Sequence, residues 1–568
     1  MMKAVPLGIH TILRARYQRR YNHFMQHLDN AHHIQKMILL RMIRENQKTL
    51  FGERYQFKNI RDVKTFKEAV PVMTYEDYAP WIHQIKEGQR NVLTSEAVHL
   101  LEPTSGSCGG SKWIPYTASL KKEFIRAIGP WLADLYQRYP EIKYGTSYWS
   151  VSPALCPHQR TVGGIPVGFE DDTDYLDWSG SLMRRVLAVP PLIKRIKYIE
   201  NFRYVTAYFL LRAEDLSLVS VWNPTFLTLI VESIETHAAS LLKDIFNGHI
   251  SLPIEEDIRY LKGFIKADPI RARALEALLF SRTNVNYAKV WKNLKLISCW
   301  MDGPSQFYVQ KLVEKFPHVA IQGKGLIATE GVVSVPISLS GGCVPAYDSH
   351  FIEFQQETDA SFKLIDELKE NGIYRVIITT GGGLYRYDLQ DKIRVIGNWR
   401  GLPLLEFLGR DRVSDLVGEK LNEVHVSKVI KDSLNHYKMN PEFVMLAPQK
   451  KAHGSHYALF IQLINDVNTD RLFVLSPSID QGLKENFHYQ YARDLNQLLP
   501  LQIFVIRKDA EQAYMRRCMS EGQRLGEIKY SLLDRRDNWQ DYFEGDWYEH
   551  PSDLIRVGSV EPDKEEGR

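Results

Sequence analysis

The chain has 568 residues, too many for one compact hydrophobic core, so two or three domains are expected. A hydrophobic share of 44% and a charged share of 25% are those of an ordinary globular protein, and a net charge of +4 implies no nucleic-acid partner. The five cysteines form no CxxC pair, which argues against a disulfide framework or structural zinc and favours a reducing, cytoplasmic compartment. No apolar run approaches 18 residues, so no transmembrane segment is expected.

The first 28 residues contain no acidic residue and carry four arginines, at positions 14, 16, 19 and 20. We expect an amphipathic helix docked on the body of the protein, with its arginines in solvent. A transit peptide or a membrane-surface helix is the alternative interpretation of such a stretch.

The next segments are mainly helical. A helix is predicted over 30–52, with Asn30 as its N-cap and Gly52 just past its end. A second begins at Thr117 and is stopped by Pro140, and 144–151 has the composition of a strand. Residues 190–300 have a mostly helical pattern, with one long helix over 223–246.

Strand-like segments separated by short turns follow from residue 319. They are 374–380, 384–389, 392–397 and 402–409, with the triple glycine 381–383 as one of the turns. The pattern restarts near 409–417, which we interpret as a hinge between an N-terminal domain (1–408) and a small α+β domain (418–558). The polar residues 559–568 are expected to be disordered. The fold class is therefore α/β.

The stretch "EPTSGSCGGSKWIPYT" (102–117) is rich in glycine and hydroxyl residues and carries one cation, Lys112. Such a loop suits phosphate, because glycines let backbone N–H groups approach the oxygens. It is not a Walker A loop, since Ser111 replaces the second glycine and "KWIPY" reads as extended. No GxGxxG or GxSxG motif is present either. Taken alone, the loop is also compatible with a plain glycine-rich hairpin.

Three further motifs follow this loop in order. Thr329-Glu330 lies on a strand-like run, Asp391 follows the aromatic strand "LYRYDL", and Gly-Arg-Asp (409–411) lies at the domain boundary. This order is that of the adenylate-forming superfamily. Within it, the chain resembles the auxin-responsive acyl acid amido synthetases of plants and their bacterial relatives. The resemblance covers nearly the whole chain and includes "SVWNPTFL" (220–227) and "GEIKYS" (526–531).

The resemblance implies a large adenylate-forming domain, with mixed sheets, a β-barrel-like subdomain and flanking helices, and a small mobile C-terminal domain. It implies that ATP and Mg²⁺ activate a carboxylic acid as acyl-AMP, whose acyl group passes to an amino acid. Glu330 is the implied magnesium ligand, Asp391 the ribose acceptor, and Lys529 the charge that bridges carboxylate and α-phosphate. Glu330 and Lys529 are thus the implied catalytic residues. The full implied nucleotide site comprises Thr104, Ser105, Gly106, Ser107, Gly109, Gly325, Ala328, Thr329, Glu330, Phe351, Asp391, Arg410 and Lys529.

Candidates for the substrate site are apolar residues on two helical segments, together with glycines where the second substrate enters. They are Ile128, Trp131, Trp222, Phe226, Gly164 and Gly168. Core packing is the more common role for any single one. Phe351 could equally stack on adenine or lie in the core, and Cys156–His158 is too small a set for a metal site.

The chain departs from the family at two positions: Cys108 stands where Ser or Thr is usual, and Gln390 where Gly precedes the aspartate. Two alternatives therefore stay beside the amido synthetase, namely an acyl-CoA synthetase and a non-catalytic nucleotide-binding relative. The sequence identifies neither the acid nor the amine. We expect a monomer.

Overall fold

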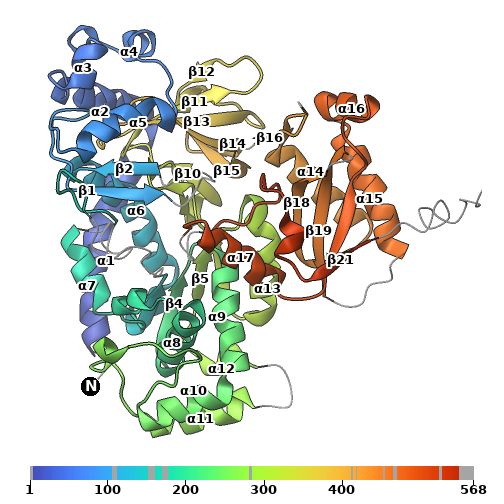
Figure 1. The fold of residues 1–568 in the computed structure, drawn as a ribbon. Coiled ribbons are helices and arrows are strands. Elements are labelled where there is room, and N and C mark those ends of the chain that lie inside the picture. The colour runs from blue at the N-terminus through green and yellow to red at the C-terminus, as the bar shows by residue number, and fades with distance from the viewer. Residues whose placement is uncertain are drawn as a thin grey trace, which may run out of the picture. The chain divides into compact units, whose positions relative to one another are not determined.

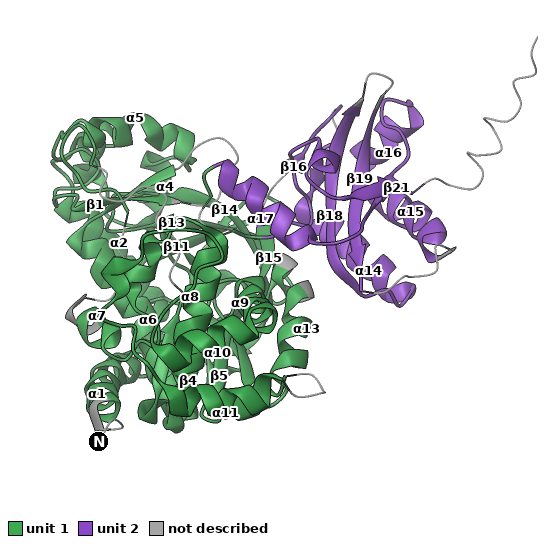
Figure 2. Ribbon diagram, turned by 60° about the horizontal axis from the view of Figure 1, so that its bottom comes forward, with its two compact units in different colours: residues 1–409, 522–529 green, residues 410–521, 530–568 purple. Residues whose placement is uncertain are grey.

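The computed structural model describes residues 4–104, 112–150, 160–168, 177–280, 285–410, 413–417, 419–451, 454–464, 470–523 and 528–548. The chain forms two compact units (Figures 1 and 2). Unit 1 comprises 1–409 and 522–529, and unit 2 comprises 410–521 and 530–568. The mixed α/β class with a separate C-terminal unit, which the sequence predicts, is confirmed. None of the described helices is long and apolar enough to cross a membrane.

Unit 1 begins with a series of helices. They are α1 (Ala4–Gln26), α2 (Ala31–Glu45), α3 (Leu50–Arg54), α4 (Val63–Ala69) and α5 (Tyr75–Lys86). Helix α1 buries Leu13, Tyr17 and Phe24 completely, while Arg14 and Arg19 are exposed. The basic N-terminal stretch is thus the docked amphipathic helix that we expected, although the helix predicted over 30–52 is divided into α2 and α3.

A four-stranded parallel sheet, in the order β3-β4-β5-β6, forms one part of unit 1. Its strands are β3 (Thr146–Trp149), β4 (Leu216–Ser220), β5 (Leu296–Cys299) and β6 (Ala320–Gly323). The helices associated with it are α6 (Ala118–Arg138), α7 (Asp177–Arg184), α8 (Ile199–Arg212), α9 (Pro224–Thr236), α10 (Ala238–Asn247), α11 (Pro269–Leu279), α12 (Tyr287–Val290) and α13 (Gln306–Lys315). Thr117 caps α6 by accepting a hydrogen bond from the Leu120 N–H, as the predicted helix start requires.

The second part of unit 1 is antiparallel. Its five-stranded sheet, in the order β12-β11-β13-β14-β15, has the strands β11 (Phe351–Gln356), β12 (Phe362–Lys363), β13 (Ile373–Thr379), β14 (Tyr387–Trp399) and β15 (Leu402–Arg410). Short hairpins precede it: β1 (Leu100–Thr104) with β2 (Lys112–Tyr116), β7 (Ile327–Ala328) with β8 (Gly331–Val332), and β9 (Ser334–Ile337) with β10 (Gly342–Pro345). The strands predicted over 384–389 and 392–397 are one long strand, β14.

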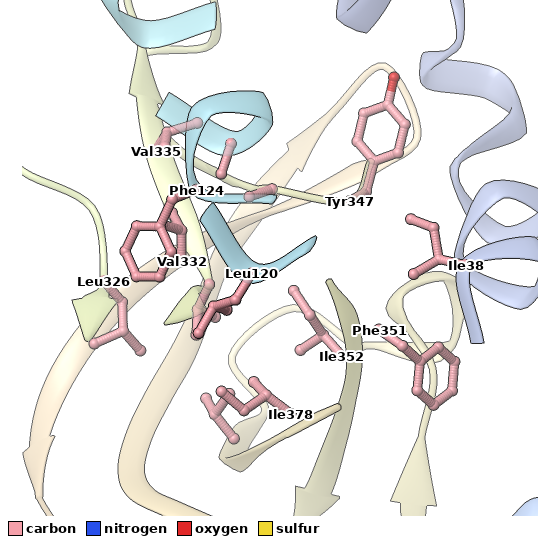
Figure 3. Close-up of a cluster of buried hydrophobic side chains, with 14 of the residues drawn as sticks. Ile38, Leu120, Phe124, Leu326, Val332, Val335, Tyr347, Phe351, Ile352 and Ile378 are labelled. Carbon is pink, nitrogen blue, oxygen red and sulfur yellow. The ribbon is translucent and has the colours of Figure 1, made fainter. Parts of the chain in front are cut away.

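A hydrophobic cluster joins the helices α2 and α6 to these strands (Figure 3). Ile38 comes from α2, Leu120 and Phe124 from α6, and Ile352 and Ile378 from the antiparallel sheet. Each of these side chains is at most 5% exposed. Because such interiors are close-packed, the cluster fixes the hairpin turns and strand ends around it.

Unit 2 contains a four-stranded sheet in the order β18-β19-β20-β21 and a short hairpin, β16-β17. Its strands are β16 (Val413–Ser414), β17 (Leu421–Asn422), β18 (Pro441–Lys451), β19 (Gly454–Leu463), β20 (Gln502–Ile506) and β21 (Gly545–Trp547). Its helices are α14 (Glu423–His436), α15 (Asp470–Leu483), α16 (Phe487–Asp494) and α17 (Ala510–Ser520).

The unit boundary falls between Gly409 and Arg410, at the start of the expected hinge. The segment 522–529 differs from expectation, because we assigned it to the C-terminal domain and it belongs to unit 1. Its described interactions explain this: the Asn223 side-chain amide donates to the Ile528 carbonyl at 2.9 Å, and the Lys529 ammonium lies over the Trp300 ring.

Candidate active site

The glycine-rich loop connects two antiparallel strands. Thr104, the last residue of β1, pairs with Lys112, the first residue of β2. The extended conformation expected for "KWIPY" is therefore confirmed. The Trp113 N–H donates to the Tyr75 hydroxyl at 2.8 Å, and the Lys112 ammonium lies 5.6 Å from the Tyr75 ring centroid. The loop residues Ser105, Gly106, Ser107, Cys108 and Gly109 lie outside the described residues, as does the Cys156–His158 stretch.

Thr329 and Glu330 form the two-residue turn between β7 and β8. We expected them on a strand, but the strands here are only two residues long, and the pair stands between them. Two tyrosine hydroxyls hold this turn. Tyr116 donates to the Thr329 carbonyl at 2.6 Å, and Tyr387 donates to the Glu330 carboxylate at 3.4 Å. Glu330 is only 8% exposed.

These two hydrogen bonds bring three sequence motifs together. Tyr116 ends the strand that follows the glycine-rich loop, and Tyr387 begins the strand that carries Asp391. Behind the turn, a Cβ added at Gly331 would meet the His350 Nε2 at 3.1 Å. His350 is itself fixed by Glu123, whose carboxylate is 2.9 Å from its Nδ1. Buried groups thus hold the turn on either side of Glu330, and the Tyr387 hydroxyl contacts the carboxylate itself.

Asp391 lies within β14, 2% exposed, as the last residue of a bulge. Across from it, Arg375 pairs with Lys392 and Ile377 pairs with Asp388, so three residues of β14 stand opposite Val376 alone. The bulge places Gln390 in the left-handed conformation, at φ 60°. That conformation favours glycine, which gives a physical reason for the glycine usual at this position. The Gln390 backbone N–H donates to the Asp388 carboxylate at 2.8 Å, a bond that glycine could make equally well.

The remaining nucleotide-site candidates that the structure describes are Gly325, Ala328, Arg410 and Phe351. Gly325 and Ala328 flank the approach to the turn, and a side chain at Gly325 would meet the Ser334 carbonyl oxygen at 2.0 Å, which explains its glycine. Arg410 ends β15. Phe351 differs, because it is fully buried in β11 (Figure 3). It contacts Phe66 edge-on, with 6.1 Å between the ring centroids. In this structure Phe351 thus packs in the hydrophobic core.

Trp131 and Trp222, two of the acid-site candidates, contact the same lysine side chain. Both rings lie over the ammonium group of Lys324, which directly follows β6. Ile128 lies one helical turn before Trp131. Phe226 instead packs on Phe202 in the core, 4% exposed.

Gly164 and Gly168, the candidates for the second-substrate wall, both have positive φ angles, 81° and 80°. The Gly168 N–H donates to the Leu101 carbonyl on β1 at 2.9 Å, so this segment borders the hairpin that holds the glycine-rich loop. A Cβ added at Gly164 would meet nothing within 4 Å. Its glycine is therefore explained by backbone conformation and not by crowding.

Sequence reasoning missed three residues here: Lys324, Trp149 and Trp300. Trp300 lies 5.4 Å from Trp222 between ring centroids and carries the Lys529 ammonium at 4.4 Å. The only available signal was that Lys324 directly follows a strand. Because β5 and β6 were themselves not recognised as parallel strands, that signal had no context.

A protein-only metal site is absent from the described residues, which contain no group of three or more His, Cys, Asp and Glu side chains suited to a metal ion. Magnesium suits the single buried carboxylate of Glu330 nevertheless. This ion typically takes one or two carboxylates and completes its shell with water and substrate phosphates.

Comparison with known proteins agrees with the motif order. The GH3 family N-terminal domain matches residues 20–321, its central domain 343–410 and its C-terminal domain 424–537. The indole-3-acetic acid-amido synthetase GH3.5 of Arabidopsis thaliana is 21% identical, over 88% of each chain. A probable indole-3-acetic acid-amido synthetase, GH3.12 of Oryza sativa subsp. japonica, is 22% identical over 88% of this chain and 90% of its own.

Solved structures share the fold. The AtGH3.15 acyl acid amido synthetase in complex with 2,4-DB has a TM-score of 0.83 at 19% identity, over 93% of this chain and 96% of its own. A 2-hydroxyisobutyryl-CoA ligase in the postadenylation state has a TM-score of 0.51 at 9% identity, over 93% and 90%. With the three domain matches in their expected order, the chain belongs to the GH3 family.

Proposed function

We propose that the protein is an ATP-dependent acyl acid amido synthetase, a ligase that joins a carboxylic acid to the amine of an amino acid. The observation that carries this proposal is the turn Thr329-Glu330, which is tied by hydrogen bonds to both the glycine-rich hairpin and the strand of Asp391. Membership of the GH3 family and the names of the relatives support it. The retained Glu330, Asp391 and Lys529 argue against a non-catalytic role.

In the first half-reaction, an oxygen of the acid's carboxylate attacks the α-phosphorus of ATP, and pyrophosphate leaves. The loop after Thr104 would hold the phosphates, and Asp391 would accept hydrogen bonds from the ribose hydroxyls. Glu330 would hold Mg²⁺, which when bound neutralises charge on the phosphates. Glu330 is buried, Tyr387 donates to its carboxylate, and Tyr116 anchors the neighbouring Thr329, so this carboxylate needs little reorganisation to act.

In the second half-reaction, the amine attacks the acyl carbon, the bond to AMP breaks, and the amine loses a proton.

Lys529 would act in the first half-reaction, where it would stabilise charge at the point where the carboxylate and the α-phosphate meet. In the structure its ammonium lies 4.4 Å from the Trp300 centroid, so the segment 522–529 already carries it on unit 1. Arg410, at the start of unit 2, would act at the hinge between half-reactions.

The test is ATP–pyrophosphate exchange over a panel of carboxylic acids, with Mg²⁺ present. We expect exchange with a subset of the acids, and an amide of the matching mass when amino acids are added. A thioester formed with coenzyme A in place of any amide would show an acyl-CoA synthetase. Binding of ATP without exchange for every acid would show a nucleotide-binding relative without this activity.

A further inference from the structure

The triple glycine 381–383, which lies between β13 and β14, packs closely against α6 and β2. A Cβ added at Gly381 would meet the Glu123 Oε1 at 2.7 Å, and one added at Gly382 would meet the Pro115 carbonyl oxygen at 2.7 Å. Both distances are shorter than a Cβ tolerates, so only glycine lets the turn approach this closely. The motif that the sequence identifies as a turn therefore also brings the start of β14 against α6.

The backbone of Gly381 is bonded on both sides by the first turns of α6. Its N–H donates to the Glu123 carboxylate at 2.9 Å, and its carbonyl accepts from the Thr117 hydroxyl at 2.8 Å. Glu123 and Thr117 are each 2% exposed. A hydrogen bond to a carboxylate is charge-assisted and belongs to the stronger kind. The turn that leads into β14, the strand of Tyr387 and Asp391, is thereby tied to α6.

The same carboxylate oxygen also binds a buried histidine. The His350 Nδ1 lies 2.9 Å from the Glu123 Oε2, the oxygen that accepts from the Gly381 N–H. An ionised carboxylate only accepts hydrogen bonds, so Nδ1 carries the hydrogen. The His350 carbonyl accepts from the Gln35 amide, and its ring lies edge-on to Phe124 with 6.0 Å between the centroids. These contacts fix both the position and the orientation of the imidazole.

The other edge of the imidazole faces the turn of Glu330. A Cβ added at Gly331 would meet the His350 Nε2 at 3.1 Å and the Cδ2 and Cε1 atoms at 3.3 Å. On the far side of the turn, the Tyr387 hydroxyl donates to the Glu330 carboxylate. The contacts form a closed circuit from Glu123 through His350 to the turn, then through Tyr387 and the triple glycine back to Glu123. Loss of Glu123 would therefore loosen two segments at once.

We propose that Glu123 and His350 are positioning residues of the adenylation site. Glu123 holds the strand of Asp391 through the Gly381 N–H, and it holds the turn of Glu330 through the His350 ring. Both side chains are buried, so they act through Glu330 and Asp391 and not on the substrate. This inference rests on the proposed function, in which those two carboxylates serve one nucleotide and must keep a fixed separation.

The first measurement is backbone amide hydrogen exchange by mass spectrometry, in the absence of ATP and Mg²⁺. Glu123→Met removes both hydrogen bonds at similar side-chain length. We expect exchange to become faster by roughly tenfold or more in peptides 326–332 and 380–387, because each loses a bond to a charged group or its support. His350→Leu keeps the Gly381 bond, so only peptide 326–332 should exchange faster. Peptide 456–463 of β19, in unit 2, is the internal reference and should not change.

The second measurement is pyrophosphate exchange. In Glu123→Met, kcat should fall roughly 10- to 100-fold for every accepted acid, the range for residues that orient a metal-ligating group, while the KM of the acid stays unchanged. Glu123→Gln should lose less, because its amide oxygen can accept both N–H groups and neutral hydrogen bonds are about half as strong. Glu276→Met, at an exposed position within α11, is the matched control and should keep the wild-type rates.

A lower unfolding midpoint of Glu123→Met in urea, with unchanged amide exchange in both peptides and unchanged kcat, would show a purely structural role and overturn the inference. If Glu123→Met does not fold by circular dichroism, Glu123→Gln and His350→Leu decide by the same two measurements. A wild type that exchanges pyrophosphate with no acid, while Glu123→Met loosens both segments, would remove the proposed function and keep their coupling. Full pyrophosphate exchange in Glu123→Met would keep the proposed function and remove the positioning role.

Discussion

The turn of Glu330 and the tryptophan cluster, formed by Trp131, Trp149, Trp222, Ser298 and Lys324, are built in opposite ways. The turn is local: two residues of a tight hairpin carry the side chain, and Tyr116 and Tyr387 anchor it. The cluster takes Trp131 from α6, Trp149 and Ser298 from β3 and β5, and Trp222 and Lys324 from just after β4 and β6, so its members are separated by up to about two hundred positions in the chain. A turn of this kind serves chemistry common to a family, whereas a cluster assembled from distant strand ends can change with the substrate.

The largest expected effect comes from the turn. Glu330→Gln should reduce pyrophosphate exchange on the order of a thousandfold for every accepted acid, because the carboxylate acts on the common phosphate chemistry. Its unfolding midpoint in urea should remain near that of the wild type, since Gln can still accept from Tyr387. Glu370→Gln, at an exposed position, is the control. An effect confined to some acids would instead place Glu330 in the acid-specific part of the site.

Lys529→Met should cost roughly 2.7–4 kcal/mol of transition-state stabilisation in adenylation, by analogy with loss of one preorganised donor. That corresponds to about a hundred- to a thousandfold in exchange rate. Amide formation from synthetic acyl-AMP and an accepted amine should be spared. The comparison of both half-reactions in one variant is the measurement, with Lys292→Met, at an exposed position, as control. Equal losses in the two would show that Lys529 is not specific to adenylation.

Asp391→Asn should weaken ATP binding by roughly 10- to 100-fold, the value of a charged hydrogen-bond acceptor. The ranking of acids should stay as in the wild type, because Asp391 lies on β14 and not in the tryptophan cluster. Nucleotide titration and the exchange panel together provide the check. A changed ranking at unchanged ATP affinity would move Asp391 to the acid-specific part of the site.

The sequence was informative where the signal is short-range. The helix start at Thr117, the extended "KWIPY" and the docked basic helix depend on neighbouring residues or on one periodicity, and all three were predicted. The turn at Glu330 was predicted as part of a strand-like run because apolar residues flank it on both sides, while each strand is only two residues long.

The tryptophan cluster could not be predicted because its strands were not. β4 and β5 are buried on both faces and lie among helices, so their short apolar runs resemble buried helix segments. Without those strands, nothing aligned Ser220 with Ser298 or placed Lys324 at a sheet end. Trp131 and Trp222 were identified as acid-site candidates, but as apolar wall residues and not as faces around a cation.

A further prediction concerns how the free energy of unfolding depends on pH through Asp302. Asp302 follows β5, and burial, with Glu406 nearby, raises its pKa to about 6. The folded state then binds a proton between about pH 4 and 6 that the unfolded state has released, so this carboxyl favours folding at low pH and loses that contribution as pH rises through 6. Asp302→Asn should therefore stabilise the protein on the order of 2 kcal/mol at pH 7.5 and hardly at pH 4. Denaturant unfolding at the two pH values measures this, and a pH-independent difference would contradict it.

The smallest expected effect is on stability and comes from Gln390, in the bulge of β14 next to Asp391. A residue with a side chain costs about 1–2 kcal/mol in the left-handed conformation, while glycine loses about 0.5–1 kcal/mol more backbone entropy on folding. Gln390→Gly should therefore raise the free energy of unfolding by about 0.5–1 kcal/mol, and Gln390→Val should lower it, because β-branched residues are strained at positive φ. The Asp388 hydrogen bond uses the backbone N–H and persists in both variants. ATP affinity of the glycine variant should equal that of the wild type, since the bulge that positions Asp391 is unchanged. A glycine variant less stable than the wild type would show that the glutamine side chain contributes contacts that outweigh the strain.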